Sequence, residues 1–162
     1  MKILVISDSH GNIANLKHVM GFAKKIKVKA VIHCGDWDNA ESAKTVLSFG
    51  IPLYTVLGNA DIDPEIGKRL KESASLRGKS KSFSENYLEF EIDNKKIGMI
   101  HDIRSLPKVD VLFCGHTHQQ FEEVIDSVRV INPGALENGI NFAVYETVNN
   151  RVEFFDDEIV HR

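Results

Sequence analysis

The stretch VISDSHG at residues 5–11 ends an apolar run and places Asp8 and His10 one residue apart. The run before them, Lys2–Ser7, is short and β-branched and does not alternate between apolar and polar positions. This pattern is typical of a strand that is buried on both faces. Beyond the loop, apolar residues recur at helical spacing from Ile13 to Ala23. The region is therefore predicted to form a buried strand, a polar loop and an amphipathic helix.

Strand and helix alternate through the rest of the first half. Lys29–Cys34 and Ile51–Leu57 are predicted strands, Glu41–Phe49 is a predicted helix between them, and a short helix is expected from Pro64 to about Lys71. Such alternation indicates βαβ units and a largely parallel sheet.

The pattern changes after the polar segment Ser73–Ser84, which is predicted to be a loop. From there we expect only strands, with tight turns that favour antiparallel pairing. The predicted strands are Tyr87–Asp93, Lys96–Ile100, Val109–Cys114, Phe121–Ile125, Val128–Asn132, Phe142–Thr147 and Arg151–Phe155. Together the two halves predict an α/β fold of two packed mixed β-sheets flanked by helices, an αββα sandwich, in a single domain over residues 1–162.

Composition excludes several functional classes. The 162-residue chain has a formal net charge of −3, so it carries no basic nucleic-acid footprint. Cys34 and Cys114 each end an apolar run, as free buried thiols do in a reducing compartment. The opening apolar run is too short for a secretory signal, and no segment reaches the length of a membrane span. We expect a cytoplasmic protein.

The polar residues that need an explanation follow predicted strands directly. They are Asp8, His10, Asp36, Asn59, His101, His116 and His118. Because sites in open α/β sheets form at the carboxyl ends of strands, these side chains are expected to meet in one region. Imidazole and carboxylate ligands suit divalent transition metals, and seven ligands suit two ions that share a bridging carboxylate. Gly35, Gly58 and Gly115 would let the backbone turn sharply and approach an ion or substrate.

The order of these motifs, D-x-H, G-D, G-N, H and G-H-x-H, resembles the calcineurin-like metallophosphoesterases. The resemblance covers essentially the whole chain and is closest to the small single-domain phosphodiesterases of bacteria and archaea, including INPGA at residues 131–135. It implies hydrolysis of small phosphodiesters or nucleotides by in-line attack of a hydroxide held between two divalent ions. Manganese is the first candidate, with nickel, iron and zinc as alternatives.

The same resemblance implies roles for individual residues. Asp8, His10 and His118 would bind the first ion, and Asp36 would bridge both. Asn59, His101 and His116 would bind the second. Asn59 would also face the phosphate, and Asn59 and Asp36 are the expected catalytic positions.

The sequence departs from the family pattern at two places. Ala60 stands where larger members carry a histidine that assists the leaving group, and the segment between His101 and Gly115 is short. Two alternative functions stay open. The divergence of the family leaves room for a phosphomonoesterase or nucleotidase, although Ala60 counts against monoesters with poor leaving groups. The altered segment after His101 favours a catalytically weak metal-binding scaffold for protein partners. Family members can form homodimers, but no stretch identifies an interface.

Four residues near these motifs are given supporting roles. His33 is expected either to pack in the core or to orient Asp36. Asp61 is expected to be structural or to support the residues of the site, rather than to act directly in catalysis. Asp38 is predicted to cap a helix. Trp37 could line a pocket or pack in the core.

Overall fold

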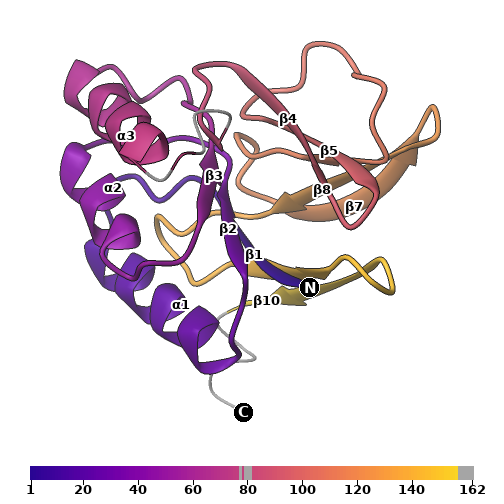
Figure 1. Cartoon of the computed structure of the whole chain (residues 1–162), viewed down its shortest axis with the longest axis horizontal. Helices are drawn as coiled ribbons and strands as arrows, with labels where there is room; N and C mark the ends of the chain where they lie inside the picture. Colours follow the sequence, from indigo (N-terminus) through magenta and orange to yellow (C-terminus); the bar gives the residue numbers. More distant parts are fainter. Residues whose placement is uncertain (77, 79–81, 157–162) are drawn as a thin grey trace.

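The computed structural model describes residues 1–76, 78 and 82–156. It contains two mixed five-stranded sheets and three helices, which confirms the predicted fold class. Figure 1 shows the helices on one side of the molecule and the sheets beside them. Among these residues, no helix combines the length and the apolar character that a membrane span requires.

The first sheet has a parallel centre and two antiparallel strands at one edge. The parallel strands are β1 (Lys2–Ile6), β2 (Ala30–His33) and β3 (Leu53–Thr55). The strands β9 (Phe142–Glu146) and β10 (Arg151–Phe155) return to this sheet and pair antiparallel, in the order β10-β9-β1-β2-β3.

The second sheet differs from the antiparallel pairing expected for this half of the chain. Its strands are β4 (Tyr87–Ile92), β5 (Lys95–Ile100), β6 (Val111–Phe113), β7 (Gln120–Ile125) and β8 (Val128–Pro133). Their order is β4-β5-β6-β8-β7, and β5, β6 and β8 are parallel to one another. Only the edge strands β4 and β7 run antiparallel to their neighbours. The parallel centre matters because it brings the carboxyl ends of β5 and β6 to the same edge of the sheet.

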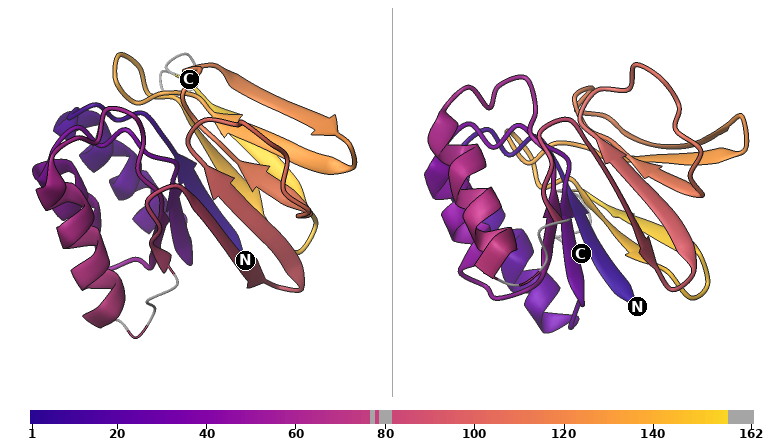
Figure 2. Two further views of the ribbon diagram at one scale, coloured as in Figure 1. Left: turned by 90° about the horizontal axis from the view of Figure 1, so that it is seen from above. Right: turned by 45° about the horizontal axis from the view of Figure 1, so that its top comes forward.

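Helices α1 (Ile13–Lys25), α2 (Ala40–Leu47) and α3 (Pro64–Leu76) cover the outer face of the first sheet. The two views in Figure 2 show the helices on one side of the paired sheets. Helix α3 is longer than predicted, because Ile66, Leu70 and Ala74 continue one buried stripe into the segment assigned to a loop. The part of the predicted loop at residues 77 and 79–81 lies outside the described residues.

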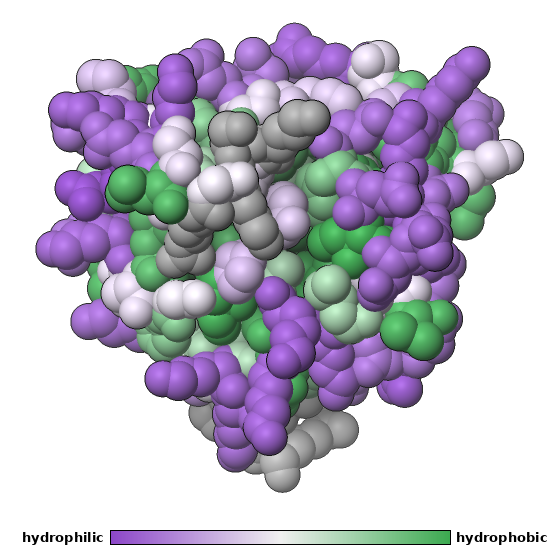
Figure 3. Space-filling view, viewed as in Figure 1, coloured by the Kyte–Doolittle hydropathy of each residue, from purple (hydrophilic) through white to green (hydrophobic). Residues whose placement is uncertain are grey.

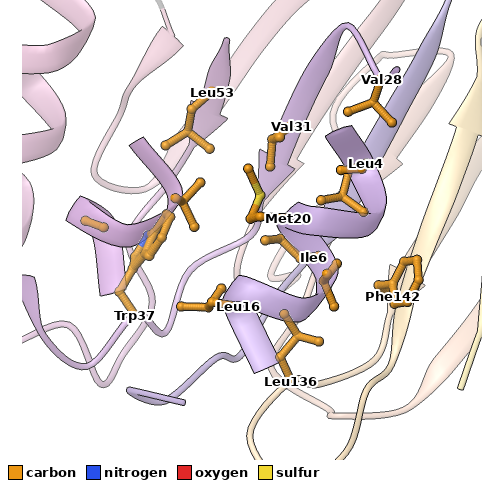
Figure 4. Close-up of a cluster of buried hydrophobic side chains, with 14 of the residues drawn as sticks. Leu4, Ile6, Leu16, Met20, Val28, Val31, Trp37, Leu53, Leu136 and Phe142 are labelled. Carbon is orange, nitrogen blue, oxygen red and sulfur yellow. The ribbon is translucent and has the colours of Figure 1, made fainter. Parts of the chain in front are cut away.

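Alternate residues of β1 face two different cores. Leu4 and Ile6 pack against the helices, in the cluster drawn in Figure 4, whereas Ile3 and Val5 pack between the sheets. A third cluster lies on the outer face of the second sheet, where Ile103 and Leu106 of the segment between β5 and β6 pack over it. This short segment, rather than a helix, is the outer covering among the described residues. Hydrophilic residues dominate the outline of the face shown in Figure 3.

Candidate metal centre

All seven predicted site residues follow the carboxyl ends of five strands, β1, β2, β3, β5 and β6. The two sheets meet at these ends, where the Nδ1–H of His101 donates to the carbonyl oxygen of Cys34 at 2.8 Å. Asp8 and Asp36 are buried at the floor of the site together with His101, whereas Asn59, His116 and His118 lie exposed at its rim.

The first group of donor atoms gathers around Asp8. The Nε2 atom of His118 lies 3.2 Å from Oδ1 of Asp8 and 3.3 Å from Nε2 of His10. These three residues place one ligand atom each within 4.8 Å of one another, which is a spacing that can hold a metal ion.

The second group gathers around the side-chain oxygen of Asn59. This Oδ1 atom lies 3.0 Å from Nε2 of His101 and 3.1 Å from Nδ1 of His116. Asp8, Asp36 and His101 also lie close enough together to hold an ion.

Asp36 lies between the two groups. Its Oδ2 atom is 3.4 Å from Nε2 of His10 and 3.2 Å from Nε2 of His101. Ligands bonded to one ion at about 2.1 Å stand roughly 3 Å apart at neighbouring coordination positions. The donor spacing in both groups therefore fits divalent ions, with Asp36 placed to touch both.

The two buried carboxylates also need positive charge. Among the described residues, the ion-pair partners of Asp8 and Asp36 are histidines, with no lysine or arginine. A buried carboxylate without a paired cation is costly, and bound metal ions would remove that cost. The histidines also supply neutral nitrogen ligands that suit such ions.

The pKa shifts of the central pair follow from their contact. Burial opposes the charged form of Asp36, but its pKa is nevertheless lowered. The groups that outweigh burial are the hydrogen bond with His101, the N–H of Ala60, and the charges of His101 and His10. Burial likewise opposes the charged form of His101, but the hydrogen bond and the charges of Asp36 and Asp8 raise the pKa of His101. The floor of the site thus favours charged carboxylate.

The loops of the site adopt an unusual backbone conformation. Five of the seven site residues have positive φ: Asp8 (50°), His10 (40°), Asp36 (61°), His116 (70°) and His118 (61°). Such residues are uncommon outside glycine and cost about 1–3 kcal/mol each, so they persist where the surrounding structure enforces them. Five such residues in one site indicate that local backbone strain accompanies the convergence of these side chains.

Asp61 holds the backbone of four residues in the loops after β2 and β3 in place. Its carboxylate accepts hydrogen bonds from the backbone N–H groups of Asp36 (2.9 Å), Trp37 (2.7 Å), Asp38 (2.9 Å) and Gly58 (2.8 Å). Burial and the charge of Asp36 raise the pKa of Asp61, and the N–H groups of Gly58, Asp38 and Trp37 act against that rise. Asp61 therefore has the structural role that the sequence predicted.

Ala60 supports the site through its backbone. Its N–H donates to Oδ1 of Asp36 at 2.9 Å, which leaves Oδ2 free to face His10 and His101. The residue that lacks the family histidine side chain thus still orients the shared carboxylate.

The prediction that Asp38 caps helix α2 is wrong. Asn39 is the cap, and its side-chain oxygen accepts the N–H of Ser42 at 2.9 Å. Asp38 instead places its Oδ1 atom 3.1 Å from Nδ1 of His10. A carboxylate at this position favours the proton on Nδ1, which leaves Nε2 of His10 as the unprotonated atom that faces His118 and Asp36.

A further carboxylate beside the site, that of Glu137, could not be predicted from the sequence. Oε2 of Glu137, in the loop after β8, lies 3.7 Å from Nδ1 of His118. This is an ion-pair distance and is too long for a hydrogen bond. No motif in the chain marks Glu137, because its approach depends on how a distant loop folds back.

Replacing Asp38 with alanine is expected to weaken metal binding by about tenfold, because His10 loses the group that orients it. Titration of the metal-free protein with Mn²⁺ measures this. Asp38→Asn is the control, since its amide oxygen can still accept from Nδ1, and it should bind within about threefold of the unaltered protein. Unchanged affinity in Asp38→Ala would show that His10 needs no such support.

A cleft of about 640 Å³ opens beside the second donor group. Asn59, His101 and His116 line one part of it, and Asp102 and Arg104, which form an ion pair at 3.3 Å, line another. The short segment after His101 thus contributes to the cleft as well as covering the second sheet.

Comparison with known proteins agrees with this fold. The sequence profile of the calcineurin-like phosphoesterase superfamily domain matches residues 1–150. The chain is 30% identical over 144 residues to phosphodiesterase MJ0936 of Methanocaldococcus jannaschii, covering 83% of each protein. It is 30% identical over 146 residues to a probable metallophosphoesterase of Mycoplasma pneumoniae, covering 84% of this chain and 79% of the relative.

A solved structure described as a novel archaeal phosphodiesterase superposes with a TM-score of 0.83 at 25% identity, covering 96% of this chain and 99% of that one. The fold, the order of the motifs and these matches lead to one conclusion. The protein belongs to the calcineurin-like phosphoesterase superfamily.

Proposed function

We propose that the protein is a phosphodiesterase that holds two divalent metal ions and hydrolyses small phosphodiesters or nucleotides. The observation that carries this proposal is the position of Asp36, whose Oδ2 atom lies 3.4 Å from His10 and 3.2 Å from His101 and so belongs to both donor groups. The relatives named as phosphodiesterase and metallophosphoesterase support the same reaction class.

Each donor group would hold one ion. Asp8, His10 and His118 would bind the first, and Asn59, His101 and His116 would bind the second, with Asp36 shared. When bound, such ions lower the pKa of water toward 7 and offset the negative charge that builds up on phosphoryl oxygens. Mixed nitrogen and oxygen ligands suit Mn²⁺, which we place first, and also Ni²⁺, Fe²⁺ and Zn²⁺.

The exposed rim is where a substrate would bind. With its Oδ1 atom directed at His101 and His116, Asn59 keeps its amide N–H₂ as a donor for a phosphoryl oxygen. The adjoining cleft of about 640 Å³ has room for one of the two ester groups.

The methyl group of Ala60 cannot donate a proton to a departing alkoxide. A general acid typically contributes about 10²–10⁴-fold, so esters with poorly stabilised leaving groups should react slowly. Aryl esters, whose leaving groups need no proton, are the substrates of choice for a first assay.

The decisive assay strips the protein of metal with a chelator, returns Mn²⁺, and follows hydrolysis of bis(p-nitrophenyl) phosphate and p-nitrophenyl phosphate. We expect no turnover without metal, hydrolysis of the diester on addition of Mn²⁺, and a smaller rate for the monoester. A faster monoester rate would instead indicate a phosphomonoesterase.

Binding of two ions without turnover by any of Mn²⁺, Ni²⁺, Fe²⁺ or Zn²⁺ would contradict the proposal and favour a scaffold. The described surface gives that alternative little support. Its exposed large hydrophobic residues are spread over several elements, with Ile62 after β3, Leu76 at the end of α3, Val124 and Ile125 on β7, and Val148 between β9 and β10.

A further inference from the structure

His33 is a buried histidine that the proposed reaction does not use. It is the last residue of β2 and is fully shielded from solvent. Its ring stacks on Trp37 with centroids 3.5 Å apart and an interplanar angle of 12°. Trp37 is itself fixed by a hydrogen bond from Nε1 to Oγ1 of Thr55 at 3.2 Å. The ring plane of His33 is therefore held from one side by the core.

Both ring nitrogens of His33 have partners. Nδ1 accepts the backbone N–H of Gly35 at 3.1 Å, so the proton of the neutral ring is on Nε2. Nε2 lies 3.0 Å from Oγ of Ser9 and donates to it. The hydroxyl of Ser9 in turn points to the carbonyl oxygen of Asp36 at 3.4 Å.

These contacts join the two loops that carry the first metal ligands. Ser9 stands between Asp8 and His10, and Gly35 precedes Asp36. The loops already run side by side through backbone hydrogen bonds, from Asp8 N–H to the Gly35 carbonyl oxygen (3.0 Å) and from His10 N–H to that of Asp36 (3.0 Å). His33 adds the side-chain connection beneath them.

An apolar residue in this place would leave the N–H of Gly35 without its acceptor and the buried Ser9 hydroxyl without its donor. A histidine supplies one acceptor and one donor on a rigid ring. Burial, followed by the charges of His101 and His10, outweighs the opposing charge of Asp36 and lowers the pKa of His33 to about 3, so the ring stays neutral beneath the proposed site.

We propose that His33 is a positioning residue that acts through Ser9 to hold the Asp8–His10 loop against the Asp36 loop, and that it thereby sets the affinity for the metal ions. The inference rests on the proposed metal site. It assigns His33 an effect on ligands that it does not touch.

Two substitutions separate the contacts of the ring. In His33→Asn the side-chain oxygen can still accept from Gly35, but the side chain is too short to reach Ser9. In His33→Gln the longer side chain can place an N–H near the position of Nε2. Ser9→Ala removes the same contact from the other side, together with the bond from the Ser9 hydroxyl to the carbonyl oxygen of Asp36. Val46→Ala, in the buried face of α2, is the control for a loss of stability away from the site.

The measurement is Mn²⁺ titration of each metal-free protein by calorimetry at low temperature, with circular dichroism to confirm folding. We expect His33→Asn and Ser9→Ala each to raise the dissociation constant of the tighter ion by about tenfold, as loss of outer-sphere support typically does. The double variant should be no weaker than the weaker single variant, because both remove one contact. His33→Gln should bind within about threefold of the unaltered protein.

Unaltered affinity in both His33→Asn and Ser9→Ala would overturn the proposal, as would equal weakening in Val46→Ala or in His33→Gln. If His33→Asn does not fold, Ser9→Ala compared with Val46→Ala decides the matter. Because the readout is metal affinity, a protein that binds Mn²⁺ but hydrolyses nothing would refute the proposed phosphodiesterase activity and leave this test intact.

Discussion

Replacing Asp36 with asparagine is expected to reduce turnover of an aryl phosphodiester at least about a thousandfold, because loss of charge stabilisation by an ion is worth several kcal/mol. The amide would keep an oxygen for the N–H of Ala60, as Oδ1 of Asp36 does now. It would then present N–H₂ instead of an oxygen to Nε2 of His10 and of His101. An amide nitrogen that carries two protons cannot ligate either ion.

The same substitution should lower the number of Mn²⁺ ions bound from two to one or none. Calorimetric titration gives this number, and the aryl diester assay gives the rate. Asp126→Asn is the matched control, since Asp126 lies exposed in the turn between β7 and β8, where its φ of 47° is one that asparagine accepts. Near-normal turnover with two bound ions in Asp36→Asn would refute the proposal that Asp36 is a ligand shared by two ions.

The gathering of the seven site residues could be predicted from the sequence because it depends on a general property of parallel sheets. Strands that run in the same direction end at the same edge, so residues that directly follow β1, β2 and β3 must come together. The short buried runs that mark those strands are also the plainest signals in the chain. His101, His116 and His118 of the second sheet lie together because β5 and β6 are parallel and end at the same edge. The sequence did not reveal this parallel pairing.

The supporting contacts could not be predicted in the same way, since they depend on the register between loops. Asp38 follows Asp36 by two residues and looks like a helix cap next to Asn39. Only the pairing of its loop with the Asp8–His10 loop brings it 3.1 Å from His10. Asp38 and Asn39 can both cap a helix by their residue type. The tertiary structure determines that Asn39 caps α2 and that Asp38 contacts His10.

The length of α3 also could not be predicted from the local sequence pattern. The segment Ser73–Ser84 is polar, which predicts a loop, but Ala74 lies four residues beyond Leu70 and continues the buried face. A single small apolar residue is a weak signal in a sequence. Packing of α3 on the sheet, rather than local propensity, stabilises this last part of the helix.

Gly58→Ala and Gly115→Ala are expected to disrupt the site by filling space that the two carboxylates need. A methyl group on Gly58 would lie 2.1 Å from Oδ1 and 2.6 Å from the backbone nitrogen of Asp36. A methyl group on Gly115 would lie 2.6 Å from Oδ2 of Asp8 and 2.0 Å from Oγ of Ser7. Neither glycine has a φ in the left-handed region, so the conflict comes from the added atom alone.

Each variant should lose measurable Mn²⁺ binding and should be destabilised by about 1–3 kcal/mol, as overpacking typically does. The effect of Gly58→Ala should be the larger, because its conflict includes a backbone atom that cannot rotate away, whereas the Ser7 hydroxyl can. Gly21→Ala is the control, since that position in α1 has no neighbour within 4 Å and alanine favours a helix. Calorimetric titration and urea unfolding measure the two effects. Full metal affinity in Gly58→Ala would mean that Asp36 can be displaced without harm, which would contradict both its role as the shared ligand and the need for its position to be fixed.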